Sequence, residues 1–67
     1  MITNKLSEIL GRKRIMQTEL SKLSGVSYGA IKNLYQDKTK GIDFDTLNKL
    51  CKALDCTPND ILRYTPD

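Results

Sequence analysis

The sequence lacks the residues on which most enzymes and metalloproteins depend. Its 67 residues include no histidine and no tryptophan, only one phenylalanine, and only two cysteines. Without histidine the commonest general base is missing, and neither Cys51 nor Cys56 has an imidazole to activate it. Two cysteines alone cannot complete a four-ligand zinc site either. We therefore expect no enzyme, no catalytic residue, no metal and no cofactor.

Long apolar segments are also missing. No run approaches the roughly 18 apolar residues that would indicate a membrane span, and the N-terminal residues have no signal-peptide pattern. The cysteines are too few for a disulfide framework, so Cys51 and Cys56 are expected to be reduced, with Cys51 packed as a small apolar residue. These absences predict one cytoplasmic domain with no membrane partner.

Charge is unevenly distributed along the chain. Residues 1–40 carry eight basic and three acidic side chains, whereas residues 41–67 carry three basic and five acidic ones. A positive field over the first part attracts polyanions, although an ordinary solvated surface could look the same. The cluster Arg12, Lys13 and Arg14 either contacts phosphates or complements the dipole of the helix that it ends. We favour the second interpretation.

Apolar spacing predicts five short helices. Their expected ranges are 3–13, 17–24, 28–35, 44–54 and 58–64. In this prediction Ile2 belongs to the inner stripe of the first helix, Leu20 and Leu23 face inward from the second, and Phe44 begins the stripe of the fourth. No segment alternates with period two for long enough to form a strand, so the expected fold is all-α.

Turn and capping residues support these boundaries. Gly25 stands where the chain must reverse, a position that favours the left-handed conformation open to glycine. Ser27, Asp43 and Thr57 are expected N-caps, the last followed by Pro58 and by the acidic Asp60.

The segment from 17 to 34 is the most informative part of the chain. Two short helices joined through a glycine pack at the steep angle of a helix-turn-helix motif. Such packing needs a small residue at the close approach, which Ser21 supplies, and apolar residues in the wedge between the helices. Val26, Ile31 and Leu34 fill that wedge.

With these residues the sequence resembles the Cro-like, phage-repressor (Xre) family of helix-turn-helix proteins. The resemblance covers nearly the whole chain, including Gln17-Thr18-Glu19-Leu20, Gly25-Val26-Ser27 and the closing stretch from Asp45 to Leu62. It implies a compact five-helix, lambda-repressor-like domain over residues 1–67, with the motif at helices 2 and 3. It also implies that helix 28–35 lies in the major groove while helix 17–24 crosses the backbone.

The resemblance further implies a set of DNA-binding residues. Those expected at base edges are Tyr28, Gly29, Lys32 and Asn33, and those expected at phosphates are Gln17, Ser27, Lys38, Thr39 and Lys40. For Tyr28, a phosphate bond or packing on a thymine methyl group are both open. Gly29 and Ala30 offer no polar side chain, and Gly29 costs the helix about 1 kcal/mol relative to alanine. Gly29 either limits base reading or lets the backbone approach DNA closely.

The expected function is a sequence-specific regulator of transcription that binds double-stranded DNA and acts as a repressor by occupying a promoter. The family resemblance suggests a homodimer on a pseudo-palindromic site, and no small-molecule ligand is indicated. The alternative is a protein-interaction module of the same fold, an antitoxin or adaptor with weak DNA affinity. An exposed apolar patch of Ile61, Leu62 and Tyr64 would suit that role, and it would equally suit a homodimer seam. Tyr35 and Tyr64 are expected to be packing or edge residues.

Overall fold

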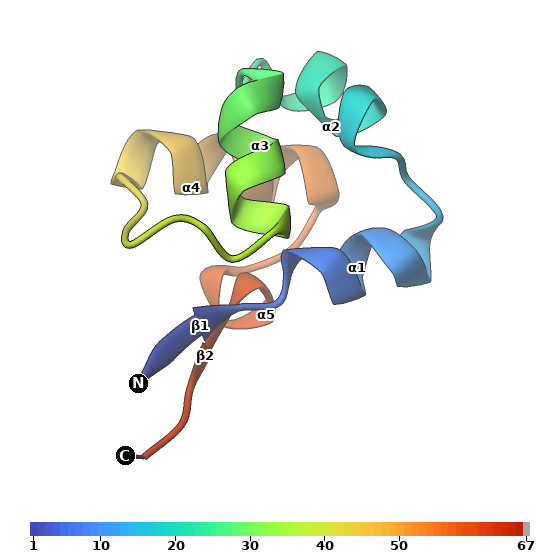
Figure 1. Cartoon of the computed structure of the whole chain (residues 1–67). Coiled ribbons are helices and arrows are strands. Elements are labelled where there is room, and N and C mark those ends of the chain that lie inside the picture. Colours follow the sequence, from blue (N-terminus) through green and yellow to red (C-terminus); the bar gives the residue numbers. More distant parts are fainter. Residues whose placement is uncertain (67) are drawn as a thin grey trace.

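A computed structural model describes residues 1–66, which form five helices and two short strands (Figure 1). In chain order the elements are β1 (Ile2–Asn4), α1 (Leu6–Lys13), α2 (Gln17–Ser24), α3 (Tyr28–Tyr35), α4 (Phe44–Leu54), α5 (Pro58–Ile61) and β2 (Leu62–Tyr64). The ranges of α2, α3 and α4 coincide with those indicated by the apolar spacing.

The core is built from leucine and isoleucine side chains that each helix contributes, together with Val26 from the turn between α2 and α3. Its members are less than a tenth exposed: Leu6, Ile9, Leu10, Leu20, Val26, Ile31, Leu34, Leu50, Leu54 and Ile61. No charged or polar side chain among residues 1–66 is buried. The helices are therefore held together by apolar burial, and polar contacts serve mainly to fix helix ends.

The turn between α2 and α3 is built as the sequence predicts. Gly25 ends α2 with φ of 78°, the left-handed conformation that favours glycine. Val26 is buried, and the hydroxyl of Ser27 accepts a hydrogen bond from the backbone N–H of Ala30 at 3.3 Å. The expected cap at Ser27 and the expected reversal at Gly25 are thus confirmed.

The expectation of an all-α chain without strands is wrong. Residues 2–4, predicted to lie in or beside the first helix, form β1, and they pair antiparallel with β2, with Ile2 opposite Tyr64 and Asn4 opposite Leu62. Helix α1 begins only at Leu6, and Ile2 is 69% exposed rather than buried on a helix face. The strand escapes sequence analysis because its partner lies about sixty residues away and no local pattern records that pairing.

The last helix is also shorter than predicted. Instead of running over 58–64, α5 ends at Ile61, and Leu62 turns to the extended conformation with φ of −110° and ψ of 148°. The backbone N–H of Lys5 donates to the carbonyl of Ile61 at 2.6 Å, so pairing with the N-terminal segment replaces further helical hydrogen bonds. Ile61 is 1% exposed, so it belongs to the core and not to an exposed apolar patch.

Two other predicted core residues lie at the surface. Leu23 is 63% exposed, because α2 turns its small serines inward: the Ser21 hydroxyl donates to the carbonyl of Val26 at 2.7 Å, and that of Ser24 donates to Leu20 at 2.7 Å. Phe44 is 88% exposed at the first position of α4, which lies at the outer edge of the molecule in Figure 1.

Helix length also bears on the expected lack of a membrane span. The longest helix, α4, has 11 residues. Within residues 1–66 no helix is both long and apolar enough to cross a bilayer.

Candidate nucleic-acid interface

Helix α3 presents a polar and basic surface to solvent. Its buried side carries Ile31 and Leu34, whereas Tyr28, Gly29, Lys32 and Asn33 are all exposed. We call these four residues the outer face of α3. Because they follow one another at helical spacing around the side opposite the core, the structure brings together all four residues predicted to read base edges. Lys32 supplies positive charge, and none of the eight residues of α3 is acidic.

The side chain of Asn4 fixes the C-terminal end of α3. Its Nδ2 donates to the carbonyl of Leu34 at 2.9 Å and to the carboxylate of Asp37 at 3.0 Å, while its Oδ1 accepts from the backbone N–H of Leu6 at 3.0 Å. One amide therefore joins β1, the start of α1 and the end of α3. We call these three hydrogen bonds the Asn4 clamp. This role of Asn4 could not be predicted from the sequence, because its partners Leu34 and Asp37 lie 30 and 33 residues away along the chain.

The loop predicted to bind phosphates, residues 38–40, follows directly on Asp37, which is part of the Asn4 clamp. Asp37 adopts the left-handed conformation with φ of 57°, and the N–H of Lys38 donates to the carbonyl of Asn33 at 2.9 Å. Lys38, Thr39 and Lys40 are exposed. The bond from Lys38 to Asn33 holds the loop at the C-terminal end of α3, whereas Ser27 lies at the N-terminal end of the same helix.

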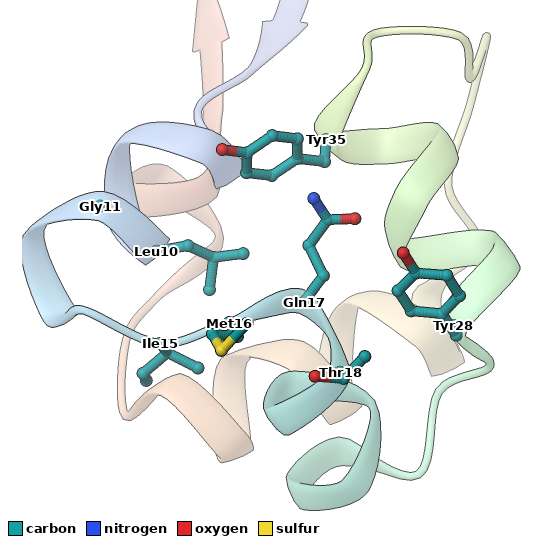
Figure 2. A pocket seen from close by; sticks show the side chains of 8 residues that line it. All are labelled: Leu10, Gly11, Ile15, Met16, Gln17, Thr18, Tyr28 and Tyr35. Atoms are coloured by element: carbon teal, nitrogen blue, oxygen red, sulfur yellow. The ribbon is translucent and has the colours of Figure 1, made fainter.

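Gln17 is placed differently from the other predicted phosphate contacts. It is only partly exposed, and it lines a hollow of about 360 Å³ between the end of α1, the start of α2 and the side of α3. Figure 2 shows its amide between the rings of Tyr28 and Tyr35. Gln17 is the first residue of α2, so its side chain and the free N–H groups of the first turn lie at the same end of the helix.

Tyr35 is the residue of this region that sequence analysis missed. It was expected to be a packing or edge residue, and at 39% exposed it lies at the edge of the fold, where it shares the hollow with Gln17 and Tyr28. A signal was available in the sequence: Tyr28 and Tyr35 are seven residues apart, two helical turns on the same side of α3.

Two of the three basic residues at the end of α1 lie near acidic side chains. Arg12 and Lys13 line a second hollow, of about 300 Å³, together with Asp55 and Asp60. Hydrogen bonds from Thr57 lower the pKa of Asp60, and the positive charges of Lys5 and Arg12 add to that effect. Arg12 and Lys13 thus lie near intramolecular acids, and both stand in the last turn of α1, where positive charge complements the helix dipole.

The two cysteines lie at the C-terminal end of α4 as free thiols, each half-buried. The N–H of Cys56 donates to the carbonyl of Cys51 at 3.0 Å across the left-handed residue Asp55. Burial raises the pKa of the Cys56 thiol, and the neighbouring Cys51 contributes to the same shift. A protonated thiol is a poor nucleophile. Within the described residues no group of three potential metal ligands occurs.

Comparison with known proteins places the chain in a family. A model of the Cro/C1-type HTH DNA-binding domain matches residues 5–67. The uncharacterized HTH-type transcriptional regulator YozG of Bacillus subtilis (strain 168) is 39% identical over 59 residues, which cover 88% of this chain and 70% of that protein.

A solved structure shares the fold. The crystal structure of a protein from Bacteroides fragilis, for which DNA binding has been proposed, superposes with a TM-score of 0.79 over 94% of this chain and 100% of the other. At 22% identity it supports the fold alone. Together with the family match, these findings define a helix-turn-helix protein. The chain belongs to the family of Cro/C1-type HTH DNA-binding domains.

Proposed function

We propose that residues 1–67 form a single DNA-binding domain that regulates transcription, with α2 and α3 as its helix-turn-helix. In this proposal α3 lies in the major groove, α2 crosses the backbone, and the protein represses by occupying a promoter in the cytoplasm. The observation that carries the proposal is the outer face of α3: four exposed residues without an acid, on a helix anchored at its N-terminal end by Ser27 and at its C-terminal end by Asn4.

Each residue of the interface has a distinct role in this proposal. Lys32 donates to guanine O6 and N7, and Asn33 pairs with adenine N6 and N7. Gly29 lets the backbone approach the base edges, and Tyr28 stands at the first turn. Contacts to phosphates position the domain without reading sequence. The residues assigned to them are Gln17, Ser27, Lys38, Thr39 and Lys40.

The domain is proposed to act as a homodimer on a pseudo-palindromic site, with half-sites about one helical turn apart. The apolar surface available for pairing differs from the one the sequence suggests, because Ile61 is buried. The two-stranded sheet of β1 and β2, which we call the terminal sheet, offers another apolar surface. Ile2 and Tyr64 are cross-strand partners there, and each is 69% exposed. The burial of Ile61 equally removes the docking patch expected for the alternative, an antitoxin or adaptor.

Titration of mixed-sequence duplex DNA at several salt concentrations tests the proposal. Binding should weaken linearly on a log–log plot of affinity against salt, with a slope equivalent to several phosphates. A duplex selected from a random pool should then bind more tightly than the mixture, with two chains per duplex. Absence of binding at low salt would overturn the DNA-binding function.

Two variants separate base reading from phosphate contact. Lys38→Ala is expected to weaken binding by a similar factor on all sequences and to reduce the salt slope by about one. Asn33→Ala is expected to leave the slope unchanged but to reduce the preference for the selected duplex, by about 1–3 kcal/mol. If both variants lowered affinity for selected and mixed duplexes equally, with the same slope, α3 would not be the reading element.

A further inference from the structure

The hollow beside Gln17 combines an apolar floor with polar groups at its rim. Leu10 and Ile15 contribute apolar surface, and Gln17, Thr18, Tyr28 and Tyr35 contribute side chains that can form hydrogen bonds. We call it the tyrosine hollow (Figure 2). No lysine or arginine lines it, so any anion bound there would be held by neutral donors rather than by a formal charge.

The amide of Gln17 is incompletely satisfied within the tyrosine hollow. Its Oε1 is buried and has no hydrogen-bond partner among the described residues, the only buried side-chain oxygen or nitrogen there in that condition. Leaving a buried carbonyl unpaired is unfavourable, so a donor is expected to approach it in the functional state. Figure 2 shows the Tyr28 hydroxyl on the same side of the hollow as this oxygen.

The position of the tyrosine hollow relates it to the DNA backbone. Tyr28 and Tyr35 lie two turns apart along the side of α3 that adjoins the start of α2. Tyr28 is therefore at one edge of the outer face of α3, and Asn33 is at the other edge. When a recognition helix occupies the major groove, its partner helix crosses the phosphate backbone. The side of α3 that adjoins the start of α2 therefore meets the groove wall, where phosphates lie, rather than the base edges.

From these observations, and resting on the proposed function, we infer that the tyrosine hollow seats one backbone phosphate of duplex DNA and that Tyr35 is a further DNA-contacting residue. The Tyr28 hydroxyl donates to Gln17 Oε1 and thereby orients the amide. Gln17 Nε2 and the Tyr35 hydroxyl then donate to oxygens of the same phosphodiester. Tyr28 thus serves the phosphate contact, and base reading is left to Lys32 and Asn33.

This inference predicts a distinctive effect of Tyr35→Phe, which removes one hydroxyl and leaves the ring. Affinity for the selected duplex should fall about tenfold, the scale of a lost hydrogen bond to a charged group. The salt slope should stay the same, because no positive charge is lost. Lys38→Ala serves as the contrast, since it should lower the slope. Asn48→Ala, at an exposed position of α4, is the control, and it should bind as the unsubstituted protein does.

Single methylphosphonate substitutions in the selected duplex test the contact itself. Each replaces one charged phosphate oxygen by a methyl group, and a scan along the strand should reveal the position where the unsubstituted protein loses affinity. At the position seated in the tyrosine hollow, Tyr35→Phe should show almost no additional loss, while it should remain sensitive at all other positions. Tyr28→Phe should reduce the loss at that same position in part.

The outcomes separate this inference from the function on which it rests. If the unsubstituted protein binds no duplex, the proposed function itself fails. If it binds and Tyr35→Phe has the same affinity and the same methylphosphonate profile, the tyrosine hollow does not seat a phosphate. A loss for Tyr35→Phe that is equal at every phosphate position would show a general effect on folding or docking, and would overturn the specific contact as well.

Discussion

At the scale of single residues, Asn4 has more structural consequence than its place near the N-terminus suggests. Its part-buried amide makes three hydrogen bonds. It donates to the Leu34 carbonyl and to the Asp37 carboxylate, and it accepts from the backbone N–H of Leu6. The carbonyl of Leu34, one of the unsatisfied groups at a helix end, has Asn4 as a side-chain donor. The orientation of α3 is therefore coupled to the terminal sheet through one side chain.

Replacement of Asn4 by alanine is expected to lower the free energy of unfolding by about 1–3 kcal/mol, because part-buried donors and acceptors lose their partners. Urea unfolding followed by circular dichroism measures this change. Thr3→Ala is the control, since Thr3 is the adjacent residue of β1 and its side chain points to the opposite face of the sheet. An equal effect of the two substitutions would contradict the clamp role of Asn4.

At the scale of elements, the short helix α5 depends on its first turn. The Asp60 carboxylate accepts from the backbone N–H of Thr57 at 3.0 Å and from its hydroxyl at 3.2 Å. These bonds lower the pKa of Asp60 below its usual value. A carboxylate with a lowered folded-state pKa stabilises the protein above its unfolded-state pKa, about 3.9 for aspartate. That stability is lost as the pH falls through the folded-state value.

The corresponding experiment compares acid unfolding of the protein and Asp60→Asn. The variant keeps an oxygen that can accept from Thr57 but cannot ionise. Between neutral pH and a pH below the usual aspartate pKa, its stability should therefore fall less than that of the unsubstituted protein. Some dependence should remain, because the pKa of Asp43 is also lowered, chiefly by the Thr46 side chain. Identical pH profiles for both proteins would exclude this role for the Asp60 charge.

Helix α3 contains a glycine where alanine would be better for the isolated helix. A Cβ added at Gly29 meets no atom within 4 Å, so Gly29→Ala should raise the free energy of unfolding by about 1 kcal/mol. Affinity for DNA should nevertheless fall, because Gly29 lies in the outer face of α3 where the added methyl meets the groove. Asn48→Ala, at an exposed position of α4, should give a comparable gain in stability without the loss of affinity. Unchanged affinity of Gly29→Ala would show that its backbone does not approach DNA.

The elements that could be predicted from the sequence are those with local signals, and the contacts that could not be predicted join distant parts of the chain. Helices α2, α3 and α4 could be located because their signals are local: Gly25 ends one, Ser27 caps the next, and the spacing from Leu47 to Leu54 repeats over two turns. The strands could not, because Asn4 and Leu62 meet only in the folded chain. Within the candidate interface, the outer face of α3 follows from helical spacing, whereas the Asn4 clamp and the tyrosine hollow depend on how α1 and α2 pack beside it.

At the scale of the whole molecule, most positive and most negative charges are carried by different parts of the chain. The positive charges of the first forty residues include Lys32, Lys38 and Lys40 on and after α3, whereas Asp43, Asp45, Asp55 and Asp60 belong to α4, α5 and their flanking turns. A molecule with its positive potential concentrated in this way is oriented by a polyanion before contact is made. The expected sensitivity of binding to salt therefore applies to the rate of association as well as to affinity.

The terminal sheet also determines how the chain would respond to tension. The amino group of Met1 donates to the carbonyl of Thr65 at 2.6 Å, so the two ends of the described chain leave the molecule side by side. A force that pulls those ends apart loads the hydrogen bonds between Met1 and Thr65 first, then the pair Ile2–Tyr64 and the next pairs inward, each in turn rather than all together. The sheet would open like a zipper at low force, and the load would then reach Asn4. Through that one amide, mechanical tension on the ends is transmitted to the end of α3.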